Sequence, residues 1–201
     1  MKEIAIITPG GDAPGMNACI RAVVRRAISS GFEVVGVMNG YRGLVDETLI
    51  KMDARTVSGI IQHGGTILKS SRCAEIKTPV GLSKAVQTLK KNKIAHLIVI
   101  GGDGSIKAAE KISKNGISVI CIPASIDNDV FGTDETIGFD TAIDTAVEAI
   151  DKIRDTATSF DRVFIVEVMG REHGFLAVEV GLASGAEFVL IPEVKYNITK
   201  I

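Results

Sequence analysis

The feature that most constrains the fold of this chain is the alternation of short aliphatic runs with segments of helical periodicity. Several runs lack polar–apolar alternation, as expected for parallel strands buried on both faces. The predicted strands are residues 4–8, 33–38, 96–100, 118–122, 162–168 and 188–191. The predicted helices are residues 16–30, 81–91, 106–114, 141–155 and 174–183. This order predicts an α/β fold with a doubly wound, mostly parallel sheet, and we expect residues 1–201 to form one continuous domain.

Composition narrows the functional classes. The chain is 46% hydrophobic with a formal net charge of −1, which favours a packed core and gives no support to a nucleic-acid partner. Its three cysteines have no CxxC spacing, so we expect a reduced cytoplasmic protein without disulfides or a Cys/His metal cluster. The three histidines are expected to be surface or loop residues. No apolar run approaches the roughly 20 residues that span a bilayer, so we expect no membrane association.

Ligands of doubly wound sheets bind outside the carboxyl ends of the strands. In this chain those ends are followed by segments rich in Gly, Asp and Arg, namely residues 9–17, 39–43, 101–105, 123–139 and 169–174. The 21 glycines are a larger share of the 201 residues than the average of about 7%. This pattern predicts a phosphate-and-metal site at that edge of the sheet.

Two glycine-rich loops each follow a predicted strand and open a predicted helix, where backbone N–H groups can approach an anion. Residues 9–17 are not a Walker A loop, because Met16-Asn17 stands where Lys-Ser/Thr is required, and they can also be interpreted as a tight turn. Residues 101–105 (GGDGS) place Asp103 among glycines. A carboxylate there can face a triphosphate only through a divalent cation, which predicts Mg²⁺.

An acidic loop follows, with Asp127 and Asp129 two residues apart and pointing the same way if the segment is extended. The loop is not an EF-hand, because Phe131 and Gly138 occupy ligand positions. One carboxylate beside a metal-bound phosphate can accept a proton from an attacking hydroxyl. The alternative is a pair of solvated loop aspartates.

Arginines supply the complementary charge. Arg72 and Arg171 lie in loops where a guanidinium could bind phosphate and stabilise charge during transfer. Arg21 and Arg25 share one face of the first predicted helix, as a solvated face or as a separate anion site.

Together these motifs are similar to those of the bacterial ATP-dependent 6-phosphofructokinase family, in order and over the whole chain. The motifs are 10–18 (GGDAPGMNA), 101–105 (GGDGS), 125–129 (SIDND), 132–142 (GTDETIGFDTA) and 167–171 (EVMGR). The resemblance implies a phosphofructokinase-like three-layer sandwich. It also implies an enzyme of glycolysis that transfers a phosphoryl group from MgATP to the 1-hydroxyl of fructose 6-phosphate, giving fructose 1,6-bisphosphate and ADP.

The resemblance also implies residue roles. Asp127 would be the general base, Arg72 and Arg171 would stabilise developing charge, and Asp103 would hold Mg²⁺. ATP would contact Gly11, Arg72, Cys73, Gly102, Asp103, Gly104 and Ser105. The sugar phosphate would contact Ser125, Ile126, Asp127, Asp129, Arg162, Met169, Gly170 and Arg171. Because the family arginine at Arg162 reaches a neighbouring subunit's substrate, an oligomer is implied, a homotetramer by resemblance. An allosteric site for ADP and phosphoenolpyruvate would use Arg21, Arg25, Arg154, Gly185 and Glu187.

Three departures from the family pattern bear on these roles. Ala124-Ser125 replaces Gly-Thr and keeps the hydroxyl. Pyrophosphate-using relatives carry Asp at Gly104 and Lys at Ala124, so the residues present favour ATP. One allosteric arginine has no match, since Ala54 stands there beside Arg55.

Other interpretations stay open. The chain could be a pyrophosphate-dependent kinase, another GGDG-type kinase acting on NAD or a lipid, or a nucleotide-binding fragment without catalysis. Family members continue past residue 201 into a second lobe that supplies more of the sugar-phosphate site. We therefore expect either a fragment or an unusually short protein, with that lobe absent or incomplete.

Overall fold

The computed structural model describes residues 3–160 and 162–200, and its centre is one sheet in the order β3-β2-β1-β4-β5. The strands are β1 (Glu3–Ile7), β2 (Glu33–Val37), β3 (Leu49–Met52), β4 (Ile94–Gly101) and β5 (Ser118–Pro123). All neighbouring strands are parallel except β2 and β3. The prediction of a mostly parallel α/β sheet is confirmed.

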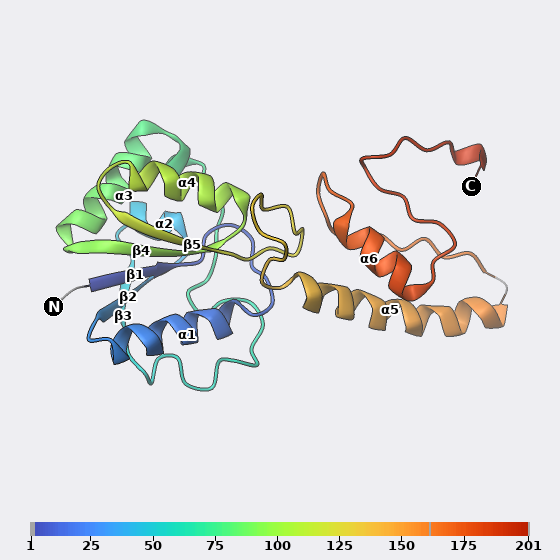
Figure 1. The fold of residues 1–201 in the computed structure, drawn as a ribbon, viewed down its shortest axis with the longest axis horizontal. Helices are drawn as coiled ribbons and strands as arrows, with labels where there is room; N and C mark the ends of the chain where they lie inside the picture. Colours follow the sequence, from blue (N-terminus) through green and yellow to red (C-terminus); the bar gives the residue numbers. More distant parts are fainter. Residues whose placement is uncertain (1–2, 161, 201) are drawn as a thin grey trace.

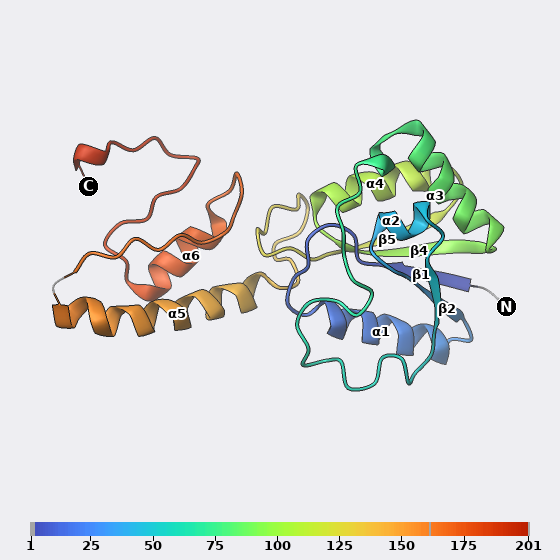
Figure 2. The same cartoon turned by 180° about the vertical axis from the view of Figure 1, so that it is seen from behind.

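Helices cover both faces of the sheet. Helix α1 (Met16–Ser29) lies on one face, and α2 (Tyr41–Val45), α3 (Pro79–Lys91) and α4 (Asp103–Ser113) lie on the other (Figures 1 and 2). Ile6 of β1 is buried with Ile20 of α1, whereas Ile7 is buried with Leu89 of α3 and Ile112 of α4. Because successive residues of β1 enter different cores, the strand is apolar from residue 4 to residue 7.

Strand β3 and helix α2 were not predicted from the sequence. Strand β3 has only four residues, and it is stabilised by antiparallel pairing with β2, with Met52 opposite Val34. A short pairing of this kind leaves no periodic signal in the sequence. Helix α2 has five residues and includes Gly43, which lowers its intrinsic helix propensity.

Beyond the sheet, α5 (Phe139–Phe160) and α6 (Phe175–Ser184) form a separate body to one side (Figure 1). They share a small apolar cluster in which Phe139, Leu176 and Val180 are buried. Two single turns of 3₁₀ helix complete the elements, η1 (Glu75–Lys77) and η2 (Ile198–Lys200). The prediction of a single domain over residues 1–201 stays a prediction.

The predicted strands at 162–168 and 188–191 were wrong, since neither segment is a strand in the described part of the chain. A strand needs a neighbouring backbone to pair with. Val163 and Ile165 are instead 94% and 96% exposed. Among the described residues, none of the helices combines the length and apolar character needed to cross a membrane.

Candidate functional site

The two predicted glycine loops meet at the carboxyl ends of β1 and β4. The Ser105 hydroxyl donates to the Pro9 carbonyl at 2.8 Å, and a Cβ on Gly101 would lie 2.9 Å from the same oxygen. The Tyr41 hydroxyl donates to the Ser105 carbonyl at 2.7 Å. Ser105, predicted to bind nucleotide, is buried and holds the loops against each other.

Asp103 and Gly104 begin helix α4, where free backbone N–H groups favour an anion. A Cβ at Gly104 would meet nothing within 4 Å, so space for a ligand is open there. The Asp103 carboxylate lies 2.6 Å from Lys107 Nζ, one turn along the helix. The described residues contain no group of three or more side chains that could hold a metal ion by themselves. A single carboxylate fits Mg²⁺ that is bound mainly through phosphate oxygens and water.

The loop that carries residues 63–71 is fixed by a buried amide that sequence reasoning missed. Asn17 of α1 is 1% exposed, and its Nδ2 donates to the carbonyls of His63 at 2.9 Å and Gly64 at 3.2 Å. Its Oδ1 accepts from Ile67 N at 2.8 Å. The only signal in the sequence is a polar residue among apolar ones near the start of a helix.

The same loop is attached to the end of β1. The Thr8 hydroxyl shares a hydrogen bond of 3.0 Å with the Thr66 hydroxyl, and Gly10 N donates to the Ser71 carbonyl at 3.4 Å. Arg72 and Cys73 follow directly, the first exposed and the second half-buried. The predicted nucleotide contacts at Gly11, Arg72 and Cys73 therefore belong to adjoining loops at one edge of the sheet.

The acidic loop is closed by its own polar groups. Ser125 Oγ accepts from Asp127 N at 3.1 Å, and Asn128 Oδ1 accepts from Thr136 N at 2.9 Å. A Cβ on Gly102 would lie 3.6 Å from Ser125 Cβ, so this loop adjoins the GGDGS loop. The structure thus brings the predicted metal loop and the predicted base loop together.

Three charged or titratable groups act on the Asp127 carboxyl. Burial and the neighbouring Asp129 raise the pKa of the Asp127 carboxyl, and the positive charges of Arg171 and His173 oppose that rise. Arg171 lies in a turn that closes when His173 N donates to the Gly170 carbonyl at 2.9 Å, and its φ is +55°. His173 is a loop residue, as expected, but its approach to the carboxylates was missed.

Of the remaining predicted substrate residues, Arg162, Met169 and Gly170 lie in the segment after α5, and Ile126 lies in the acidic loop before it. Met169 is exposed, and Gly170 is buried against the His173 carbonyl. The Arg162 guanidinium lies 5.0 Å from the centre of the Phe160 ring. Ile126 is half-buried and packs against the apolar cluster beneath α1.

The predicted allosteric residues fall into two groups. Arg154 Nη1 donates to the Ser184 carbonyl beside Gly185, while Glu187 is exposed two residues further on. Arg21 and Arg25 lie on α1, and Arg21 Nη1 donates to the Val57 carbonyl. Because α1 and the α5–α6 body are separate in Figure 1, an effector site within one chain is not formed by these two groups.

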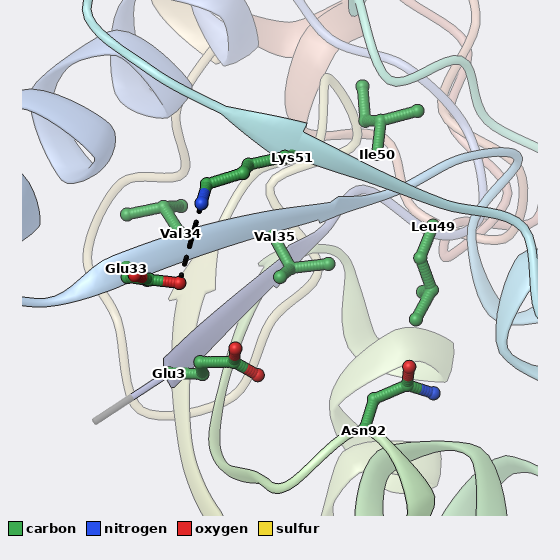
Figure 3. Close-up of a pocket in the computed structure, with 8 residues that line it drawn as sticks. All are labelled: Glu3, Glu33, Val34, Val35, Leu49, Ile50, Lys51 and Asn92. Atoms are coloured by element: carbon green, nitrogen blue, oxygen red, sulfur yellow. Dashed lines mark ion pairs between the residues drawn. The ribbon is translucent and has the colours of Figure 1, made fainter. Parts of the chain in front are cut away.

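A hollow of about 250 Å³ lies near the amino ends of β1 and β2, the edge opposite the loops above. Figure 3 shows Lys51 reaching toward Glu33, with 3.6 Å between Nζ and Oε2. The residues that line the hollow are Glu3, Glu33, Val34, Val35, Leu49, Ile50, Lys51 and Asn92. It contains none of the predicted site residues.

Comparison with known proteins identifies relatives over the whole chain. A family model described as "Phosphofructokinase" matches residues 3–201. The chain is 54% identical to the ATP-dependent 6-phosphofructokinase of Shouchella clausii and 57% identical to that of Clostridioides difficile. Each match covers 100% of this chain and 63% of the relative, so the chain spans less than two thirds of their length.

Solved structures of phosphofructokinases have a fold similar to that of this chain. Phosphofructokinase from Saccharomyces cerevisiae superposes with a TM-score of 0.89 at 39% identity, over 96% of this chain and 29% of that one. A pyrophosphate-dependent phosphofructokinase from Marinobacter aquaeolei gives a TM-score of 0.81 at 26% identity, over 100% of this chain and 55% of that one.

Proposed function

Since this chain belongs to the phosphofructokinase family, we propose that it transfers the γ-phosphoryl group of MgATP to the 1-hydroxyl of fructose 6-phosphate. The products are fructose 1,6-bisphosphate and ADP. The observation that carries the proposal is that the loop with Asp127 and Asp129 adjoins the loop that contains Asp103, with Arg171 near enough to lower the pKa of Asp127. This set supplies a proton acceptor, a cation and a carboxylate for the metal, which phosphoryl transfer requires.

Asp127 acts as the general base. Its half-buried carboxyl has a raised pKa, which makes the carboxylate a stronger proton acceptor for the sugar hydroxyl. Arg171 opposes that rise and thereby favours the ionised form that can accept a proton. Arg72 and Arg171 stabilise the charge on the transferred group, and Ser125 keeps Asp127 in place through the backbone hydrogen bond.

The nucleotide is ATP rather than pyrophosphate. Gly104 leaves open space at the start of α4, where a side chain would stand in the way of an adenosine moiety. Asp103 would hold Mg²⁺, which neutralises phosphate charge when it is bound with the nucleotide. The backbone N–H groups at the start of α4 bind phosphate oxygens.

The enzyme acts as a homo-oligomer, a tetramer by family resemblance, in the cytoplasm. Arg162 follows the end of α5 in the sequence, with its guanidinium against the Phe160 ring, and the two groups of predicted effector residues lie on separate parts of the chain. This arrangement supports an effector site for ADP or phosphoenolpyruvate that is completed between subunits.

The test is a coupled assay for ADP with fructose 6-phosphate, and with ATP or pyrophosphate as the donor. We expect turnover with ATP, and Asp127→Asn lowers kcat by at least about 100-fold while ATP binding by calorimetry is unchanged. Unchanged turnover in Asp127→Asn contradicts the assignment of the base. ATP binding without any turnover in the unmodified chain supports a nucleotide-binding module instead.

A further inference from the structure

His173 lies in the turn before α6, and its imidazole approaches the acidic loop. Its Nδ1 lies 4.0 Å from Asp129 Oδ2, and the Asp129 side chain is only 11% exposed. That nitrogen is buried and has no hydrogen-bond partner among the described residues. A buried polar atom that faces a carboxylate and lacks a partner is a costly arrangement.

The position of the ring is fixed from two sides. The His173 ring stacks on Phe175, with 5.8 Å between centroids and 14° between planes. Its backbone closes the turn to Gly170, where φ is +154° and a Cβ would lie 2.4 Å from the His173 carbonyl. The Phe175 contact and the turn hold the ring beside the acidic loop, although the His173 side chain is 42% exposed.

The charges around His173 come from three segments. Asp127 and Asp129 face it from the acidic loop, and Arg171 belongs to its own turn. Glu193 accepts a hydrogen bond from Gly174 N at 2.8 Å, which is the main cause of its lowered pKa, and the His173 charge contributes. Three carboxylates thus surround one imidazole and one guanidinium.

We propose that His173 is a positioning residue for the phosphoryl-transfer site, whose Nδ1–H donates to Asp129 Oδ2 when the site closes on substrate. A distance of 4.0 Å is too long for a hydrogen bond, but catalytic hydrogen bonds are often long without substrate and shorten in the complex. The contact draws Asp129 toward the imidazole and fixes the Asp127–Asp129 pair relative to Arg171. This inference rests on the proposed function.

A kinetic test separates a positioning role from a merely structural one. Removing the imidazole withdraws a positive charge that lowers the pKa of Asp127. In His173→Ala we therefore expect the acid limb of kcat/KM to move to higher pH and kcat to fall about tenfold, with KM for ATP unchanged. His173→Asn keeps a donor near the position of Nδ1 and restores most of kcat. His96→Asn, at the ring that meets Phe32 edge-on, is the matched control and changes neither quantity.

A spectroscopic test does not depend on turnover. Ring ¹⁵N shifts of the full chain, measured with fructose 6-phosphate and MgADP bound so that the site is closed, report which imidazole nitrogen carries the proton, and the hydrogen bond of the ring decides this. We expect a proton on Nδ1 of His173, and loss of that preference in Asp129→Leu. A neutral ring with a bare Nδ1 overturns the proposal, and so does an unchanged acid limb in an active His173→Ala. A protonated Nδ1 in a chain without turnover contradicts the proposed function but still supports the contact between His173 and Asp129.

Discussion

At the scale of single residues, Asn17 shows how one buried amide can fix a loop that leads to proposed nucleotide contacts. Its three hydrogen bonds use both donors and the acceptor of the side chain. The bonded groups are backbone atoms of one loop, which leads directly into Arg72 and Cys73. Because water cannot replace these partners in a buried position, the loop and helix α1 are fixed together.

The replacement Asn17→Ala leaves one N–H and two carbonyls of this loop without their partner. We expect the free energy of unfolding to fall by about 1–3 kcal/mol, and ATP affinity to fall as the loop loosens. Urea unfolding and calorimetry measure the two effects. Ser29→Ala, at the exposed end of the same helix, is the control, and equal stability of the two variants would contradict the assignment.

Asp127 couples the site to stability through pH. Its pKa is raised in the folded state, mainly by burial, so the folded chain binds more protons than the unfolded chain between the two pKa values. Stability therefore falls as pH rises through that window. We expect Asp127→Asn to be more stable than the unmodified chain at pH 7, by less than about 1 kcal/mol because solvent screens the carboxyl.

This advantage should disappear below about pH 4, where the unfolded carboxyl is also protonated. Thermal unfolding of both proteins at pH 3.5 and 7 checks it.

Glu193→Gln is the opposite case, because the pKa of Glu193 is lowered by the Gly174 hydrogen bond. That variant should lose stability at pH 7 and match the unmodified chain in acid.

At the scale of elements, the start of helix α4 must form a helix and also leave room for the proposed ligand, and these two requirements conflict. Gly104 is a poor helix former in the first turn of α4, and no neighbour within 4 Å excludes a side chain there. Packing therefore does not explain this glycine, whereas the proposed approach of a nucleotide would.

The variant Gly104→Ala should be more stable by up to about 1 kcal/mol, because alanine favours the helix. It should also bind ATP more weakly, because a methyl group occupies the open space. Ser113→Ala at the other end of α4 is the matched control, with ATP affinity unchanged. Titration calorimetry measures affinity, and unchanged ATP binding in Gly104→Ala would remove the nucleotide from this position.

Prediction from sequence succeeded for elements whose signal is local. Strand β4 and helix α1 were recognised because burial of both faces of a strand, or of one face of a helix, leaves an apolar pattern in the sequence. Residues 162–168 have the same apolar character, but a strand also needs a partner backbone, which the sequence of one segment does not contain. The rule that ligands bind outside the carboxyl ends of the strands predicted the loops that adjoin in the structure. The Asn17 and His173 contacts, in contrast, depend on distant segments and left no recognisable pattern.

At the scale of the whole molecule, many large apolar side chains are exposed in the part of the chain after α5. Val163 and Ile165 are almost fully exposed, and Phe188, Leu190 and Tyr196 are also exposed. Exposed apolar side chains that gather into a patch mark interaction sites or aggregation.

We expect the chain to self-associate, and the double replacement of Val163 and Ile165 by lysine to shift it toward the monomer. Stability should change by less than about 0.5 kcal/mol, because neither side chain is packed. Sedimentation velocity measures the association. Ile61→Lys, at an exposed isoleucine in the sheet body, is the control, and an equal shift in both proteins would contradict a role for the 162–168 segment.

The order of the site residues along the chain has a consequence for synthesis on the ribosome. Asp127 and Asp129 precede helix α5, whereas Arg171 and His173 follow it. Domains fold from the N-terminus as they emerge, so the sheet with its glycine loops and Arg72 can form while Arg171 and His173 are still untranslated. A nascent chain that ends within α5 therefore carries Asp127 and Asp129 before the two groups that lower the pKa of Asp127 have been made.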